Sequence, residues 1–129
     1  MTSWSIKILN SRKNNGRCIH IGIAPSDINQ NFDRIFEECG WHFSCYNSTL
    51  FSGPPHKYRG KVYGPRESKG YYVHDGDSVG VVMDTTKGEL SFVLDGVNPG
   101  VAYEGIPLDK PLVPCVNIAK KWDSVGLLI

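Results

Sequence analysis

The chain has 129 residues, a length typical of one domain that buries its own hydrophobic core. Its 14 Lys and Arg nearly balance its 13 Asp and Glu, so no global field attracts it to nucleic acid or acidic lipid. No apolar run approaches the roughly 18 residues that a membrane span needs, and the first residues lack the pattern of a signal peptide. We therefore expect a single soluble, cytoplasmic domain over residues 1–129, of the kind that also occurs as one module of a larger protein.

The first two segments alternate apolar and polar residues with a period of two, which is typical of β-strands. WSIKIL (4–9) places its apolar residues on one face, and CIHIGIA (18–24) does the same with three isoleucines before it ends at Pro25. We predict that these strands form a hairpin with a long, basic loop. The following SDINQNFDRIFEE (26–38) fits a helix only loosely, so we expect a loop with at most one helical turn.

The segment CGWHFSCYNSTLFSG (39–53) predicts a second hairpin, because apolar residues alternate around the turn-forming pair Asn47 and Ser48. Residues 53–76 are rich in Gly, Pro, Lys, Arg and Tyr, and this composition predicts a long surface loop. Loops of this length in compact domains usually have a function or are disordered.

Residues 77–108 predict a meander of three strands. The turns are expected at Thr86 to Gly88 and at Asp95-Gly96, where a two-residue hairpin loop requires positive φ at both positions. PLVPCVNIA and SVGLLI supply the last strands. About nine short strands with almost no helix predict an all-β fold, an antiparallel two-sheet β-sandwich with long surface loops.

Catalytic and metal-binding patterns are missing from the sequence. The four cysteines form no CxxC pair, and the four histidines show none of the HxH, HxxxH or HExxH spacings of zinc sites. There is no Gly-x-Ser-x-Gly, P-loop or GxGxxG that opens a helix. We therefore expect no enzyme activity, no cofactor and no metal, and we expect the thiols to be buried and reduced.

An ordered set of motifs resembles the SPRY domain family. The motifs are WSIKIL, HIGIAPSD, CGWHFSCYNSTLF, HDGDSVGVVMDTTKGELSFVLDGVNPGVAYEGIP and PLVPCVNI, and together they cover nearly the whole chain. Tyr103 stands where the family commonly has Phe. Many members have another strand or two before the aromatic-led one, whereas three residues precede Trp4 here.

The resemblance implies a non-catalytic binding module of an adaptor or scaffold protein, which recognises a peptide or protein surface with loops at one end of the sandwich. In the SOCS-box members of the family, an aromatic residue after the Gly-Trp hairpin and a Trp-containing loop before the last strand hold the peptide. Phe51 falls at the first of these places, where the family residue is Tyr. Trp122, in the segment AKKWDS with Lys120, lies near the second.

Residues 52–72 contain five Lys and Arg against one Glu, interleaved with tyrosines. Tyr and Arg are favoured contacts at protein interfaces. The segment therefore predicts a surface for an acidic or polar peptide, with these candidate contacts: His56, Tyr58, Arg59 and Tyr63. Two alternatives stay open. In the first, the segment is a solvated connection whose tyrosines pack back on the sheet. In the second, it binds single-stranded nucleic acid by stacking, and its affinity for the nucleic acid falls steeply as the salt concentration rises.

Overall fold

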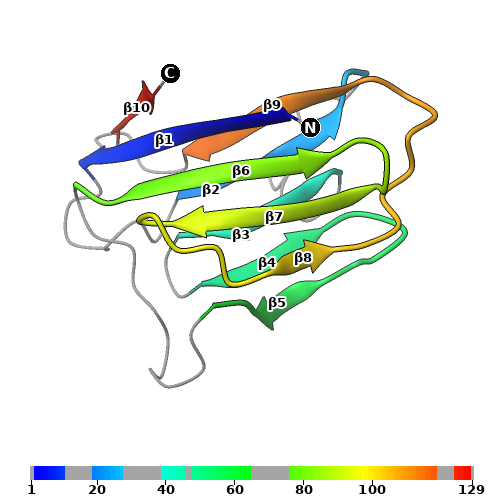
Figure 1. The fold of residues 1–129 in the computed structure, drawn as a ribbon, viewed down its shortest axis with the longest axis horizontal. Helices are drawn as coiled ribbons and strands as arrows, with labels where there is room; N and C mark the ends of the chain where they lie inside the picture. Colours follow the sequence, from blue (N-terminus) through cyan, green and yellow to red (C-terminus); the bar gives the residue numbers. More distant parts are fainter. Residues whose placement is uncertain are drawn as a thin grey trace.

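Two antiparallel five-stranded sheets pack face to face in the computed structural model, which describes residues 2–10, 19–27, 39–45, 48–64, 76–118 and 124–128 (Figure 1). Sheet A has the order β10-β1-β6-β7-β8, with β1 (Thr2–Asn10), β6 (Ser78–Asp84), β7 (Glu89–Leu94), β8 (Val101–Tyr103) and β10 (Ser124–Leu128). Sheet B has the order β5-β4-β3-β2-β9, with β2 (Ile19–Pro25), β3 (Trp41–Ser44), β4 (Thr49–Ser52), β5 (Arg59–Val62) and β9 (Leu112–Ile118). The described residues contain no helix, and the predicted β-sandwich is confirmed.

The predicted hairpin between the first two strands is wrong. Strand β1 pairs with β6 and β10, whereas β2 pairs with β3 and β9, so the two strands belong to different sheets. A tight turn fixes the register of a hairpin, but the eight-residue connection 11–18 imposes no such constraint. The proposed helical turn in residues 26–38 lies almost entirely outside the described residues.

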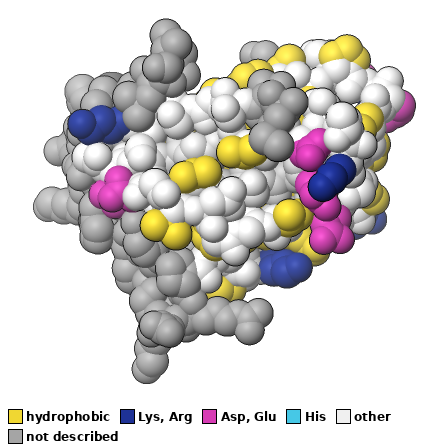
Figure 2. Space-filling model, viewed as in Figure 1, with side chains coloured by type: hydrophobic (Ala, Val, Ile, Leu, Met, Phe, Trp, Pro, Cys, Tyr) yellow, Lys and Arg dark blue, Asp and Glu magenta, His cyan; other side chains and the backbone are white. Residues whose placement is uncertain are grey.

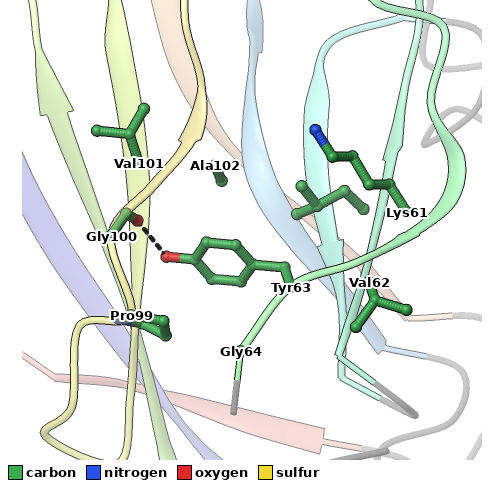
Figure 3. A pocket seen from close by; sticks show the side chains of 9 residues that line it. Lys61, Val62, Tyr63, Gly64, Pro99, Gly100, Val101 and Ala102 are labelled. Atoms are coloured by element: carbon green, nitrogen blue, oxygen red, sulfur yellow. Dashed lines mark hydrogen bonds between the residues drawn. The ribbon is translucent and has the colours of Figure 1, made fainter. Parts of the chain in front are cut away.

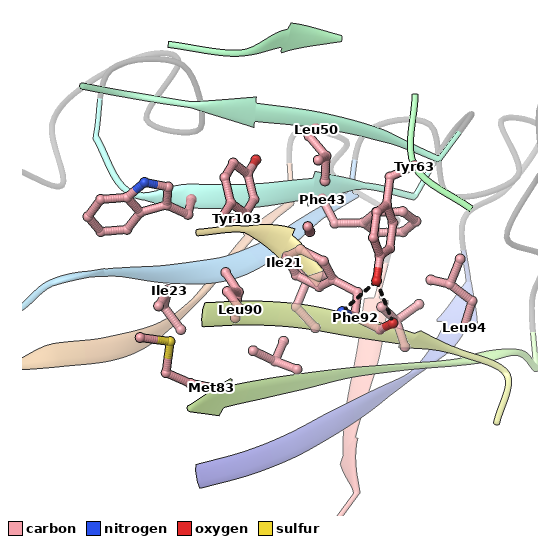
Figure 4. Close-up of a cluster of buried hydrophobic side chains, with 14 of the residues drawn as sticks. Ile21, Ile23, Phe43, Leu50, Tyr63, Met83, Leu90, Phe92, Leu94 and Tyr103 are labelled. Carbon is pink, nitrogen blue, oxygen red and sulfur yellow. Dashed lines mark hydrogen bonds between the residues drawn. The ribbon is translucent and has the colours of Figure 1, made fainter. Parts of the chain in front are cut away.

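The core lies between the sheets and is filled mainly by alternate apolar residues of β1 to β4 and β6 to β8 (Figure 4). Ile21, Phe43 and Leu50 of sheet B face Val81, Leu90 and Phe92 of sheet A, and all six are buried. At about 25 cal/mol for each Å² of apolar surface removed from water, this burial is the main favourable contribution to folding. Strand β2 is buried on both faces, because His20, Gly22 and Ala24 are also shielded from solvent.

The turns of the meander form as the sequence predicts. Asp95 and Gly96 have φ angles of +47° and +87°, and Leu94 pairs with Val97 across them. Gly88 has a φ of +68° and donates its N–H to the Asp84 carbonyl (2.9 Å), which closes the turn between β6 and β7. The Asp84 carboxylate accepts hydrogen bonds from the hydroxyl and N–H of Thr86, and these bonds lower the pKa of Asp84.

The sequence predicted one long surface loop over residues 53–76, and this prediction is wrong for part of the segment. Residues 59–62 form β5 at the edge of sheet B. Its pairing with β4 is interrupted by a register shift at Gly60, which has a φ of +99°. A bulge of this kind bends an edge strand and is easily formed at glycine. The charged, glycine-containing sequence Arg59–Val62 lacks the apolar alternation by which the other strands were predicted.

Two buried tyrosines connect the sheets in opposite directions. Tyr103 of β8 reaches sheet B, where its hydroxyl lies 2.7 Å from the His42 carbonyl and 3.0 Å from the Phe51 carbonyl. Tyr63, which follows β5, reaches sheet A, where its hydroxyl accepts the Phe92 N–H (3.0 Å) and lies 2.6 Å from the Gly100 carbonyl. Burial raises the pKa of both phenols, so both remain protonated donors.

Replacing Tyr63 by Phe should lower the free energy of unfolding by about 2 kcal/mol, because the Phe92 N–H and the Gly100 carbonyl lose their buried partner. Tyr58→Phe is the matched control, since its hydroxyl bonds only the exposed Lys61 in the described residues (3.3 Å). Urea unfolding of both variants measures the difference. An equal effect of the two substitutions would contradict the role assigned to Tyr63.

Replacing Gly22 by Ala should destabilise the domain by about 3 kcal/mol, because the new Cβ would overlap the Trp41 carbonyl of the neighbouring strand. Gly80→Ala is the control in sheet A, where a Cβ would lie 3.3 Å from the Val93 side chain and a small adjustment would accommodate it. Thermal unfolding should rank wild type and Gly80→Ala well above Gly22→Ala, and the reverse order would contradict this packing.

Candidate functional site

The loop between β4 and β5 folds against Tyr103 through His56. The Trp41 indole donates its N–H to Nδ1 of His56 (3.0 Å), so Nε2 carries the imidazole proton and donates it to the Glu104 carbonyl (2.6 Å). The His56 ring also contacts the Tyr103 ring edge-on, with the ring centres 5.5 Å apart. Both ring nitrogens are therefore engaged inside the domain, and His56 orients the loop rather than projecting from it.

Tyr58 is the exposed end of an aromatic stack that begins in the core. Its ring lies against that of Tyr103, with the ring centres 5.4 Å apart and an angle of 22° between the planes. The Lys61 ammonium lies over the Tyr58 ring, 4.5 Å from its centre, which is within the range of a cation–π interaction. Tyr58 is half-buried, and its orientation is thus set from below by Tyr103 and from above by Lys61.

Arg59 is exposed, but its backbone partners hold it in place. One terminal nitrogen donates to the Ser52 carbonyl (2.5 Å) and the Tyr58 carbonyl (2.9 Å). Its other guanidinium N–H groups form no further hydrogen bond within the described ranges. Among the described residues, no Asp or Glu forms an ion pair with Arg59 or Lys61. We call Tyr58, Arg59 and Lys61 the β5 surface.

The other predicted site residues lie apart from this surface or outside the described residues. Phe51 is half-buried on the outer face of sheet B, where its ring meets His20 edge-on at 5.8 Å between centres. Tyr63 is only 8% exposed, and its ring lines a groove described below. Lys120 and Trp122 fall in residues 119–123, outside the described residues.

Sequence reasoning missed the supports of the β5 surface. Trp41 and Ser52 were assigned to a hairpin without a further role, and Tyr103 was noted only because the family commonly has Phe there. That departure was the available signal, since a buried phenol needs a hydrogen-bond partner and a phenyl ring does not. The backbone carbonyls that accept its proton leave no trace in the sequence.

A groove of about 580 Å³ lies beside the β5 surface, between β5 and β8 (Figure 3). Tyr63 crosses its floor toward Gly100, and Lys61 is the one charged residue among the described residues that line it. A second hollow, of about 310 Å³, is lined by Trp4, Leu108 and Leu112. Hydrophobic side chains on the face of sheet A form separate small spots (Figure 2).

Of the three described cysteines, Cys45 is buried, whereas Cys39 and Cys115 are partly exposed. Burial raises the pKa of the Cys45, Cys39 and Cys115 thiols, which keeps them protonated and weakly nucleophilic. Within the described ranges no three His, Cys, Asp or Glu side chains gather in a way that would hold a metal ion. No helix long and apolar enough to cross a membrane occurs in the part of the chain that the structure describes.

The SPRY domain family model matches residues 2–126. The chain belongs to the SPRY domain family. Members of this family are in general non-catalytic protein interaction modules, and the family predicted from the sequence motifs is confirmed. Among curated protein sequences there is no significant match to this chain.

Solved SPRY domain structures share the fold of this chain. The SPRY domain of human HERC1 has a TM-score of 0.70 at 18% sequence identity, with 97% of this chain and 72% of that chain covered. Another human SPRY domain has a TM-score of 0.73 at 17% identity, with 97% of this chain and 74% of that chain covered. At these identities the likeness establishes the sandwich and leaves the ligand to be argued from this SPRY domain's own residues.

Acid should destabilise this SPRY domain through His42. Burial lowers the pKa of the His42 imidazole to about 4. The hydrogen bond between its ring and the Cys39 carbonyl (2.8 Å) has a smaller effect in the opposite direction. The unfolded chain therefore binds a proton on His42 more tightly than the folded domain does. As the pH falls from 6.5 toward 4, this difference lowers the free energy of unfolding by up to about 3 kcal/mol, whereas above pH 6.5 it has no effect. Urea unfolding from pH 7.5 to 4 should therefore show a shallower pH dependence for His42→Gln, and equal slopes would contradict this.

Proposed function

We propose that this SPRY domain recognises an acidic or polar peptide segment of a partner protein through the β5 surface, as the interaction module of an adaptor or scaffold. The observation that carries the proposal is the pair of exposed cations beside the anchored Tyr58: Lys61 lies over its ring, and Arg59 bonds the Tyr58 carbonyl. Aromatic and arginine side chains supply most of the binding energy at protein interfaces.

Preorganisation supports this assignment. Arg59 is held by two backbone carbonyls, and Tyr58 is stacked on the buried Tyr103, so few rotamers remain to be fixed when a ligand binds. Binding to a rigid surface costs less conformational entropy than binding to a mobile one. Because no described carboxylate pairs with Arg59 or Lys61, an incoming acidic group need not displace a partner from the described part of the chain.

The arrangement of Tyr58 also bears on the nucleic-acid alternative. A stacking platform needs a free aromatic face, but Tyr103 packs against Tyr58 and the Lys61 ammonium lies over its ring. The nearly balanced net charge of +1 gives no general attraction to phosphate. These features favour a peptide. Salt titration distinguishes the two ligands, because phosphate binding weakens steeply with ionic strength.

The proposal extends to the residues that the family resemblance suggested. Phe51, on the outer face of sheet B, and Lys120 and Trp122, before β10, are proposed as further contacts of the same partner. His56 supports the surface through Trp41 and Glu104. Single alanine variants of Phe51 and Trp122, included in the binding assay below, show whether the partner extends beyond the β5 surface.

Selection from a random peptide display library should enrich acidic peptides, and Arg59→Gln with Lys61→Gln should weaken their binding by about tenfold or more. The matched control, Lys7→Gln with Lys87→Gln, removes the same charge from exposed positions of sheet A and should bind normally. Fluorescence polarisation of an enriched peptide measures both. Equal affinity of the two double variants would contradict the proposal.

A further inference from the structure

Strands β5 and β8 are edge strands on the same side of the sandwich. β5 ends sheet B and β8 ends sheet A, and each has one neighbouring strand among the described residues (Figure 1). A strand with one neighbour presents a row of backbone N–H and C=O groups to which another extended chain can bind. Peptide recognition by strand addition uses such edges.

The outward backbone groups of β5 are those of Val62. The Tyr63 N–H donates to the Ser48 carbonyl (2.9 Å), and Val62 is paired in register with Thr49. In an antiparallel ladder alternate residues direct their N–H and C=O to the same neighbour. The Val62 N–H and C=O therefore point away from β4, toward the side on which β5 has no described neighbour, and the Val62 side chain is 70% exposed.

The groove between β5 and β8 provides space for the side chains of an added strand. Its lining includes the apolar residues Val62 and Val101, which are 70% and 47% exposed, and the buried Leu50 and Tyr63. The Tyr63 ring extends across the groove toward Gly100 (Figure 3). Successive side chains of an extended peptide point to opposite faces. One set would enter the groove against these apolar walls, while the other set would remain on the outer side.

The charged side chains of β5 determine which kind of chain can pair with its outer edge. Of the described residues that line the groove, Lys61 is the charged one, and Arg59 precedes it on the same four-residue strand. Antiparallel pairing of two copies through β5 would bring these cations opposite one another, and like charges directly opposite destabilise a strand pair. A segment with carboxylates at these positions would be attracted instead, so the complementary occupant is an acidic chain of another protein.

We propose that an extended segment with alternating apolar and acidic residues, from a partner protein, adds to the free edge of β5 as a sixth strand of sheet B. Its backbone bonds the N–H and C=O of Val62, its apolar side chains enter the groove beside Lys61, and its carboxylates lie on the outer face of sheet B with Arg59. This inference rests on the proposed function and specifies how the partner is held.

The test is the substitution Val62→Pro, with Val62→Thr as its matched control. Proline removes the outward N–H without removing a hydrogen bond to β4, whereas threonine keeps both the N–H and the branched shape. The probe is a short fluorescein-labelled peptide in which Val and Glu alternate. Wild type and Val62→Thr should bind it, Val62→Pro should bind at least about tenfold more weakly, and a peptide of alternating Val and Lys should not bind.

A second measurement uses the wild-type protein and so does not depend on the folding of the proline variant. N-methylation of every other residue of the Val–Glu peptide blocks one backbone edge at a time. Strand addition predicts that methylation of one edge abolishes binding while methylation of the other leaves it intact. Equal binding of both methylated peptides would overturn the proposal.

The remaining outcomes separate this inference from the proposed function. Full binding by Val62→Pro, together with loss by Arg59→Gln with Lys61→Gln, would leave the β5 surface as the site and overturn strand addition. Absence of binding to the Val–Glu peptide, while display-selected peptides still require Arg59 and Lys61, would also overturn strand addition and leave the β5 surface as the site. Failure of every acidic peptide would overturn both. Sedimentation that detects a dimer abolished by Val62→Pro would assign the edge to a second copy and contradict the proposed occupant.

Discussion

The reciprocal tyrosine contacts between the sheets are the constraint on which the rest of the structure depends. Tyr103 extends from sheet A to carbonyls of sheet B, and Tyr63 extends from the β5 end of sheet B to backbone groups of sheet A. A buried hydroxyl without a partner costs roughly 1–3 kcal/mol, so the two sheets are held at the separation that satisfies both phenols. This fixes the distance between the edge strands β5 and β8 and hence the width of the groove between them.

The same contacts connect the core to the proposed binding surface. Tyr103 is fixed through its hydroxyl and offers its ring to Tyr58 and His56, so the exposed aromatic ring is continuous with the buried core. Lys61 then contacts Tyr58 from the solvent side and lines the groove. A short, cationic, bulged strand is also a recognised way to prevent an exposed edge from pairing with its own kind. In this domain the cations that discourage self-association are the groups that would attract an acidic partner.

The sequence predicts those parts of the fold that local rules determine. The Asp95-Gly96 turn forms because both positions require positive φ, and the Trp41 hairpin forms because its apolar residues alternate around a tight turn. Pairing across long connections is not determined locally, which is why β1 and β2 were wrongly joined. β5 was missed because its stability comes from its pairing with β4 rather than from apolar alternation. Tyr58 and Arg59 were identified by composition, but the orientation of Tyr58 depends on Tyr103, which lies more than forty residues away.

The most direct test of whether an acidic peptide binds at β5 is to map the bound peptide onto the amide NMR spectrum of the domain. An acidic peptide obtained by display selection would be titrated into the ¹⁵N-labelled wild-type protein, with amide shifts and hydrogen exchange followed in parallel. Binding at the edge of β5 predicts the largest amide shifts over Arg59 to Val62 and at Val101, together with slower hydrogen exchange of the Val62 amide in the complex. Shifts confined to the face of sheet A or to the hollow at Trp4 and Leu112, with β5 unchanged, would contradict it.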